Sequence, residues 1–243
     1  MPNIWLNTRL KEQYGITTNT DLERATKSLS TFLPNPVDLS TAGLRPNIIR
    51  LFESRRKRHV VLAFLDLCDF SGTTRDAEAK SIADKLDRYY AIAVPVIYQH
   101  GGIVEKIIGD GIIVLFDDLT GDLAELYRSG RAFARDVLLA LAKADFRAKV
   151  ALHDGPIIYY SPVLEEYLDL TVVGEPLTEL FRLESVALPN TVCVYDADHG
   201  RYPEIFGPAR SSIKKPMFSR DDARPVQLQG LGPRMVLDLT PCE

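Results

Sequence analysis

The sequence predicts an α+β fold whose strands and helices follow one another as β-α-β-β-α-β, the split βαβ or ferredoxin-like arrangement. Three observations support this prediction. A continuous apolar run lies at Val60–Leu65, two long stretches repeat apolar residues at helical spacing, and two short apolar runs flank the turn Gly109-Asp110-Gly111. The chain has 243 residues, 46% of them hydrophobic, which is enough to bury a core of this kind.

The first half of the unit begins with a strand that we expect to be buried on both faces, because Val60–Leu65 is apolar throughout. Apolar residues spaced three or four apart then predict a helix over about Ile82–Ile97, which the His-Gly-Gly sequence at 100–102 ends. Strands are predicted at Ile103–Ile108 and Ile112–Phe116, joined by the tight turn between them.

The second half consists of a helix over about Asp122–Lys143 and strands near Ala148–Leu152 and Ile157–Tyr160. Further elements follow this unit. They are a strand near Thr171–Val173, a helix over about Pro176–Val186, a strand at Thr191–Tyr195, and two strands, Val226–Gln229 and Met235–Leu239, around Gly230-Leu231-Gly232.

The first part of the chain differs from the rest because it is polar and lacks this regular pattern. Two helix-like stretches, Asp21–Phe32 and Leu44–Arg56, predict a helical N-terminal extension over residues 1–57, with the main domain at 58–243. The extension closes on the basic run Arg55–His59. We interpret this run as a solvated helix end, where cations suit the helix dipole; nuclear localisation or phosphate steering are the alternatives.

Composition limits the possible function classes. The net charge of −4 argues against nucleic-acid or anionic-membrane binding, which depend on clustered excess Lys and Arg. No apolar run approaches the ~18 residues of a membrane helix, and the first residues lack a signal-peptide pattern. The three cysteines have no metal-type spacing and do not indicate a disulfide framework. We therefore expect a cytoplasmic protein.

Two aspartates distant in sequence are predicted to meet at one edge of the sheet. Asp66 directly follows the first predicted strand, and Asp110 lies in the turn between the next two. A right-handed crossover makes the first two strands parallel, with the third running back between them. Paired carboxylates at such an edge suit divalent cations that prefer oxygen ligands. The alternative is that each aspartate is a turn residue or a helix cap.

The segment after Asp66 leads from strand to helix through small and hydroxyl-bearing residues. A turn of this kind presents free backbone N–H groups that can bind phosphate. We expect Phe70 and Ser71 to contribute to substrate binding, with Ser71 and Thr73 as simple helix caps being the alternative.

Four motifs stand out over about residues 58 to 239. They are Phe64-Leu65-Asp66-Leu67-Cys68-Asp69-Phe70-Ser71, residues 101–111 (GGIVEKIIGDG), Val172-Val173-Gly174 leading into Phe181-Arg182-Leu183-Glu184, and Gln229-Gly230-Leu231-Gly232. Together, and in this order, they resemble the catalytic core of class III nucleotidyl cyclases. The resemblance implies a class III cyclase homology domain, active as a homodimer that shares its active sites across the two chains.

The resemblance also implies roles for individual residues. Asp66 and Asp110, with the backbone carbonyl of Leu67, would hold two Mg²⁺ or Mn²⁺ ions. Lys106 and Thr171 would read the nucleobase from the other chain. From the pattern alone, Lys106 shares a strand face with Val104 and Ile108, where a lysine usually snorkels to solvent or marks an edge strand.

The catalytic pair implied by the resemblance lies on the predicted helix after Pro176. Arg182 would stabilise negative charge on the α-phosphate, although by default it would be a surface ion pair. Thr178 stands where the family has a transition-state asparagine, and Leu231 stands where some members have a triphosphate-binding lysine. Lys214 or Lys215 would have to replace that lysine.

The expected reaction is the conversion of a nucleoside triphosphate to its 3′,5′-cyclic monophosphate and diphosphate. Thr178 and Asp69, which replaces a usual glycine, make the chain resemble the bacterial pyrimidine cyclases of Pycsar antiphage defence. That resemblance implies UTP as substrate and cUMP as a messenger to a separate effector. The alternatives are ATP, since Lys106 with Thr171 also suits it, CTP, and a degenerate module that binds nucleotide without turnover. A palm-type polymerase or diguanylate cyclase is a weaker alternative, because the chain lacks a Gly-Gly-Asp-Glu-Phe stretch.

Overall fold

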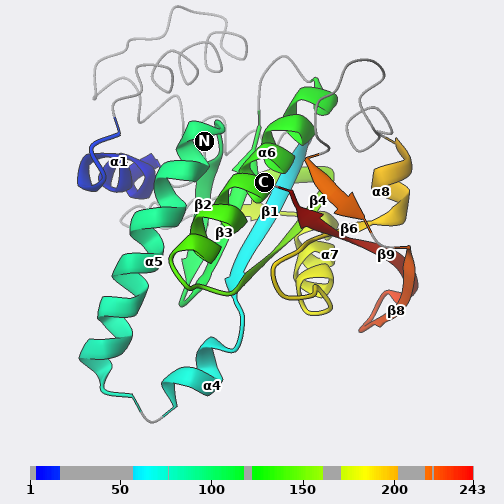
Figure 1. Cartoon of the computed structure of the whole chain (residues 1–243). Helices are drawn as coiled ribbons and strands as arrows, with labels where there is room; N and C mark the ends of the chain where they lie inside the picture. The colour runs from blue at the N-terminus through cyan, green and yellow to red at the C-terminus, as the bar shows by residue number, and fades with distance from the viewer. Residues whose placement is uncertain are drawn as a thin grey trace, which may run out of the picture.

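A computed structural model describes residues 4–16, 57–75, 77–117, 122–160, 171–201, 217–220 and 222–242. One nine-stranded sheet runs through the described domain, in the order β2-β3-β1-β4-β6-β9-β7, with β5 pairing β4 and β8 pairing β9. Figure 1 shows α5 and α6 on one face of the sheet and α7 on the other.

The element order confirms the predicted β-α-β-β-α-β unit. The elements are α1 (Ile4–Gln13), β1 (Lys57–Leu67), α4 (Phe70–Thr74), α5 (Ala79–Gln99), β2 (Ile103–Ile108), β3 (Gly111–Phe116), α6 (Leu123–Lys143), β4 (Ala148–Tyr160), β5 (Thr171–Val173), α7 (Glu175–Glu184), β6 (Val192–Tyr195), α8 (Asp196–Arg201), β7 (Phe218–Arg220), β8 (Arg224–Leu228) and β9 (Gly232–Pro241).

The strand order at the centre of the sheet is also as predicted. β3 lies between β1 and β2 and is antiparallel to both, so β1 and β2 run in the same direction. The end of β1 and the turn between β2 and β3 therefore meet at the same edge of the sheet.

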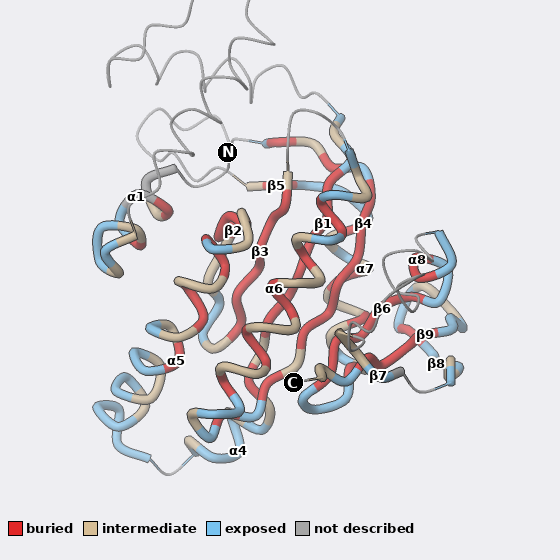
Figure 2. Tube along the Cα trace, turned by 45° about the horizontal axis from the view of Figure 1, so that its top comes forward, coloured by how far each residue is buried: buried red, intermediate tan, exposed pale blue. Residues whose placement is uncertain are grey.

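The core has two layers because β1 is buried on both faces. Val61, Ala63 and Leu65 face the cluster that includes α5 and α6. The alternate residues of β1 belong to a second cluster with α7. Figure 2 shows the central strands β1, β3 and β4 buried along most of their length. Gly130 lets α6 approach the sheet, since a Cβ there would lie 3.0 Å from Leu152 Cδ1.

Two local predictions are wrong. β4 is one strand from Ala148 to Tyr160 rather than two, because it pairs with β1 from Leu67↔Ala148 to Lys57↔Ile158 without interruption. Its Gly155 and Pro156 favour turns in isolation, but the long ladder keeps them extended.

The described part of the basic run is not a helix end, since Lys57–His59 begins β1. Arg58 forms hydrogen bonds with Asp117 at 2.6–3.1 Å, and His59 Nε2 lies 2.6 Å from Asp154 Oδ2. The strand begins this far upstream because β4 offers pairing partners over the same length.

Helix α1 lies against β2 at the edge of the sheet (Figure 1). The buried Asn7 side chain pairs with the backbone of Val104: Nδ2 donates to the Val104 carbonyl at 2.8 Å, and Oδ1 accepts from the Val104 amide at 2.9 Å. The helix-like stretches Asp21–Phe32 and Leu44–Arg56 lie outside the described residues. No helix in the described ranges is both long and apolar enough to span a membrane.

Candidate functional site

Asp66 and Asp110 meet at the predicted edge of the sheet. Leu65 pairs with Ile112, which puts Asp66 beside the β2–β3 turn that contains Asp110. Asp66 lies within β1, one residue before its end, rather than after the strand as predicted. The turn is attached to α5 because the Tyr90 hydroxyl donates to the Gly109 carbonyl.

Like charge gathers at this edge. Burial first, and then the charges of Asp110 and Glu184, raise the pKa of Asp66 to about 7, and Lys149 opposes the rise. Burial and the Glu184 charge also raise the pKa of Asp110. We call Asp66, Asp110 and Glu184, with Lys149, the edge cluster. Its donor set consists of carboxylate oxygens in a partly buried place, which fits Mg²⁺ or Mn²⁺.

The sequence analysis did not identify Lys149 and gave no role to Glu184. Lys149 Nζ lies 2.8 Å from Glu184 Oε1 and 3.9 Å from Asp66 Oδ2. Burial alone would lower the pKa of Lys149, but the hydrogen bond and charge of Glu184 and the charge of Asp66 raise it overall. Lys149 is opposite Asp66 in the β1–β4 register, so a correct prediction of that register would have revealed it.

Another buried polar group lies near the edge cluster. Tyr89 is fully buried in α5, and its hydroxyl has no hydrogen-bond partner among the described residues. Burial first, and then the charges of Asp66, Tyr90 and Asp110, raise its pKa well above the usual value. The hydroxyl is a potential donor to a group bound near the aspartates.

The helix after β1 is capped by a residue other than Ser71 or Thr73, the two caps considered in the sequence analysis. Asp69, in the left-handed region with φ 58°, is the N-cap of α4 and makes no side-chain cap hydrogen bond. Ser71 and Thr73 are therefore not the N-cap; both are exposed, and Phe70 is partly buried against the core. Lys85 Nζ donates to Thr73 Oγ1 at 3.2 Å, so a cation lies over this turn.

The predicted base-reading residues lie close to a buried carboxylate. Thr171 Oγ1 donates to Glu105 Oε1 at 2.8 Å, and Glu105 directly precedes Lys106 in β2. The strand register shifts between Val104 and Lys106, so the simple alternation that placed these two on one face does not hold there. Lys106 is partly exposed.

The predicted catalytic pair lies on one helix, α7. Thr178 is exposed and Arg182 is partly buried. Arg182 Nη1 donates to Gln229 Oε1 at 3.1 Å, whereas its buried Nε has no hydrogen-bond partner among the described residues. Leu231 packs against the α7 core cluster. Lys214 and Lys215 lie outside the described residues.

A second group of polar side chains lies around the middle of β4, and the sequence analysis did not identify it. We call it the β4 network. Potential ligand atoms of His153, Asp154 and Asp198 lie within 4.8 Å of one another. His153 Nδ1 lies 2.6 Å from Asp198, and its Nε2 lies 2.9 Å from Glu179 on α7. Arg201 pairs with both Asp154 and Asp198, so basic side chains already occupy these carboxylates.

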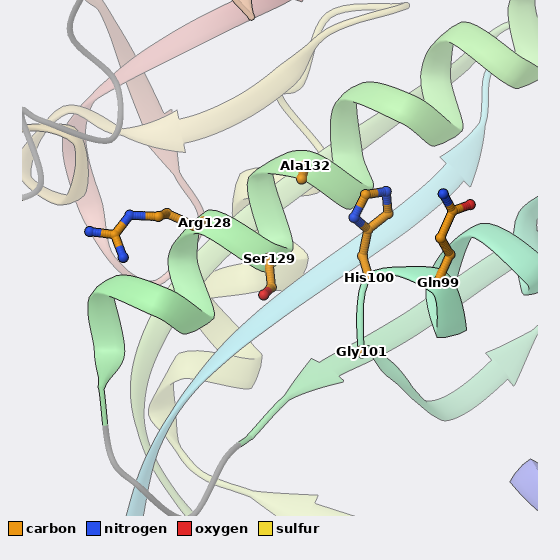
Figure 3. A pocket seen from close by; sticks show the side chains of 6 residues that line it. All are labelled: Gln99, His100, Gly101, Arg128, Ser129 and Ala132. Atoms are coloured by element: carbon orange, nitrogen blue, oxygen red, sulfur yellow. The ribbon is translucent and has the colours of Figure 1, made fainter. Parts of the chain in front are cut away.

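One surface pocket lies away from both groups, where α5 ends and α6 begins (Figure 3). It is at the opposite end of β2 from Asp110, so it does not form part of the edge cluster. Its lining residues are Gln99, His100, Gly101, Arg128, Ser129 and Ala132.

Comparison with known proteins shows the fold. No family model matches the chain. The chain is 26% identical over 133 residues to the uncharacterized protein Rv1320c of Mycobacterium tuberculosis, and 25% identical over 134 residues to Rv1318c of the same organism. Each match covers 54% of this chain, but only 23% and 24% of the relatives' own length.

Solved structures of nucleotide cyclases share the architecture. The guanylyl cyclase Cya2 has a TM-score of 0.60 and 21% identity, covering 77% of this chain and 95% of its own. The adenylyl cyclase CyaB from P. aeruginosa has a TM-score of 0.62 and 15% identity, covering 77% and 96%. The guanylate cyclase domain of RhGC from Catenaria anguillulae, in complex with GTP, has a TM-score of 0.62 and 14% identity. The predicted class III cyclase fold is confirmed.

Proposed function

We propose that the protein is a nucleotidyl cyclase that converts a nucleoside triphosphate to its 3′,5′-cyclic monophosphate and diphosphate. The observation that carries the proposal is the edge cluster, in which Asp66 and Asp110 converge with Glu184 on a partly buried point. The shared fold with adenylyl and guanylyl cyclases supports the same reaction class.

In this proposal Asp66, Asp110 and the backbone carbonyl of Leu67 hold two divalent cations, Mg²⁺ or Mn²⁺. The ions would activate the attacking hydroxyl and neutralise phosphate charge. Tyr89 and Lys149 lie beside these carboxylates. Lys149 already pairs with two of these carboxylates and Leu231 provides no charge, so Lys214 or Lys215 would supply the cation for the polyphosphate.

The remaining residues would position the nucleotide. The ribose 3′-hydroxyl gives up its proton to solvent, and its oxygen forms a bond to the α-phosphorus while the bond from that phosphorus to the bridging oxygen of diphosphate breaks. The Arg182 guanidinium, with Thr178 as a hydrogen-bond donor, would stabilise charge on the α-phosphate. Phe70 and Ser71 would line the substrate beside the metal aspartates.

We also propose a homodimer with shared sites, in which Lys106, Thr171 and Arg182 act on the nucleotide held by the partner's aspartates. Tyr160 and Val173 support this, because both are exposed large hydrophobic side chains on the β4–β5 hairpin, 36% and 40% exposed. A second copy would cover them.

For the base, we propose UTP, with cUMP acting on a separate effector in antiviral defence in the cytoplasm. The support is the pattern of Asp69 and Thr178, which resembles the pyrimidine cyclases. ATP and CTP are the competing substrates. Thr178 and Leu231 also favour the second candidate function, a module that binds nucleotide without turnover.

The test is to incubate the purified protein with each of the four ribonucleoside triphosphates and Mn²⁺ and to identify products by mass. A cyclic nucleotide from any of them supports the cyclase, and cUMP alone supports the pyrimidine assignment. Absence of any cyclic product contradicts the enzyme proposal, and cAMP alone contradicts the base assignment. For substitutions at Asp66 and Asp110, the matched control is Asp136→Asn. Asp136 is a partly exposed aspartate on α6, and the variant should remain active.

Mixing two inactive chains tests the shared site. Asp66→Ala and Arg182→Ala should each be inactive alone. Their mixture should recover up to about a quarter of wild-type activity if one site of each mixed dimer receives both intact residues. No recovery from a mixture that forms mixed dimers would contradict shared sites.

A further inference from the structure

Glu105 is a buried carboxylate directly beside the proposed base-reading residues, and no role has been assigned to it above. It is 1% exposed and lies in β2, the strand at one end of the sheet order. The β2–β3 register shifts between Val104 and Lys106, so Glu105 is the extra residue of a β-bulge. Bulges re-aim side chains near functional sites.

The bulge is supported from the outer side of β2. Asn7 on α1 pairs with both the amide and the carbonyl of Val104, as a neighbouring strand would. Tyr98 Oη donates to the same Asn7 Oδ1 at 2.5 Å. These hydrogen bonds fix the backbone at Val104, and so the position of the neighbouring Glu105 in the strand.

The contacts of Glu105 determine where one proton lies. Its Oε1 accepts from the backbone amide of Val172 at 3.3 Å, and an amide N–H only donates. The same oxygen lies 2.8 Å from Thr171 Oγ1. Because Oε1 is the acceptor there, the proton of that hydrogen bond comes from the threonine. Among the described residues, the other acceptor near Thr171 Oγ1 is the Val172 carbonyl, 3.5 Å away.

A threonine hydroxyl has a single proton to donate. Once Glu105 takes it, Thr171 offers only its lone pairs to a ligand. Lys106, with an ammonium group, offers only donors. The two residues together therefore require a base edge that carries an acceptor for Lys106 and an N–H donor for Thr171.

We propose that Glu105 is a positioning residue that sets the hydrogen-bond polarity of Thr171 and thereby determines which nucleobase the site accepts. The inference rests on the proposed function, in which Lys106 and Thr171 face the base. An exchange of amino for oxo at the base edge swaps donor and acceptor, and sites built on such groups reject the swapped analogue.

The test measures a discrimination ratio on the 243-residue chain. Dissociation constants are measured by calorimetry with Ca²⁺, and kcat/KM with Mn²⁺. The discrimination ratio is the affinity, or the kcat/KM, for the preferred nucleotide divided by the same quantity for its amino/oxo counterpart. The pairs are UTP with CTP, or ATP with inosine triphosphate. Both nucleotides are measured on one sample, so a loss of folded protein cancels in the ratio.

We expect Glu105→Met, which removes the acceptor, to lower the ratio about 10- to 100-fold, the range of one or two hydrogen bonds. Glu105→Gln keeps an acceptor oxygen and should stay within about threefold of wild type. Thr171→Val should lower the ratio as Glu105→Met does, and the double variant should add nothing further. A purely structural role would instead reduce binding of both nucleotides equally.

The outcomes separate the two proposals. An unchanged ratio in Glu105→Met, or a further loss in the double variant, overturns the role of Glu105 and leaves the cyclase proposal intact. If the protein binds one nucleotide of the pair more tightly but converts neither, the cyclase proposal is overturned. The role of Glu105 is still supported in that case if the variants change the ratio of affinities as described. If wild type binds no nucleotide, both proposals are overturned.

Discussion

The edge cluster and the β4 network both gather three carboxylates, but they differ in how the negative charge is compensated. In the β4 network, Asp154 and Asp198 are 0% and 3% exposed, and every carboxylate pairs with a base. The bases are His59, His153 and Arg201.

In the edge cluster, Lys149 pairs with Glu184 and Asp66, and Asp110 has no ion-pair partner among the described residues. Burial and neighbouring carboxylates raise the pKa values of its aspartates. Burial and the charge of Asp198 also raise the pKa of Asp154 in the β4 network, but there His59 and Arg201 oppose the rise directly. Balanced charge indicates a structural role, whereas unbalanced charge indicates a site that a cation completes.

The largest expected effect is on activity at the edge cluster. Asp66→Asn or Asp110→Asn should lower kcat about 1,000-fold or more, because a proposed metal ligand is lost. The thermal unfolding temperature of the metal-free protein should not fall, since the substitution removes like-charge repulsion. Parallel turnover assays and melting curves in EDTA measure both. A large fall in that temperature would mean that these aspartates hold the fold.

The matching substitution in the β4 network should act on stability instead. Asp198→Asn removes one partner of His153 and Arg201, and breaking buried pairs of this kind costs about 3–5 kcal/mol. Urea unfolding measures the loss. A variant as stable as wild type would contradict the structural role assigned to the network.

The β4 network should also make stability depend on pH. Burial alone would lower the pKa of His153, but hydrogen bonds and charge from Asp198 and Glu179 outweigh it and raise the pKa to about 9. A raised histidine pKa stabilises the fold fully below the unfolded value near 6.5, and this contribution is lost as the pH rises through about 9.

The difference amounts to at most about 3 kcal/mol between pH 6 and 10. Chemical denaturation over that range should show the decline in wild type and a flatter profile in His153→Gln. An equal decline in the variant would assign the pH dependence to other groups.

The smallest expected effect comes from Lys149, the base that pairs with the carboxylates of the edge cluster. Lys149→Met leaves Asp66 and Glu184 uncompensated and should destabilise the metal-free protein by about 1 kcal/mol. Added Mn²⁺ should restore more stability to this variant than to wild type. Lys143→Met, at the exposed end of α6, is the control and should match wild type in both conditions.

The backbone-level features were the more predictable. The apolar run of β1 and the helical spacing of α5 and α6 follow from local periodicity, and the order β2-β3-β1 follows from crossover handedness, so the meeting of Asp66 and Asp110 could be predicted.

Side chains that depend on register could not be predicted. Lys149 is beside Asp66 only because of the β1–β4 pairing, and Glu105 reaches Thr171 only because β2 bulges. His153 joins α7 and α8 through partners far apart in sequence. Such contacts are properties of the packed sheet rather than of any local pattern.

Mn²⁺ binding to wild type, Asp66→Asn and Asp198→Asn tests the central claim most directly. Electron paramagnetic resonance counts free and bound ions at a temperature where all three proteins are folded. We predict that wild type and Asp198→Asn bind Mn²⁺ alike and that Asp66→Asn loses this binding. Binding that survives in Asp66→Asn and is lost in Asp198→Asn would place the metal in the β4 network and contradict the account.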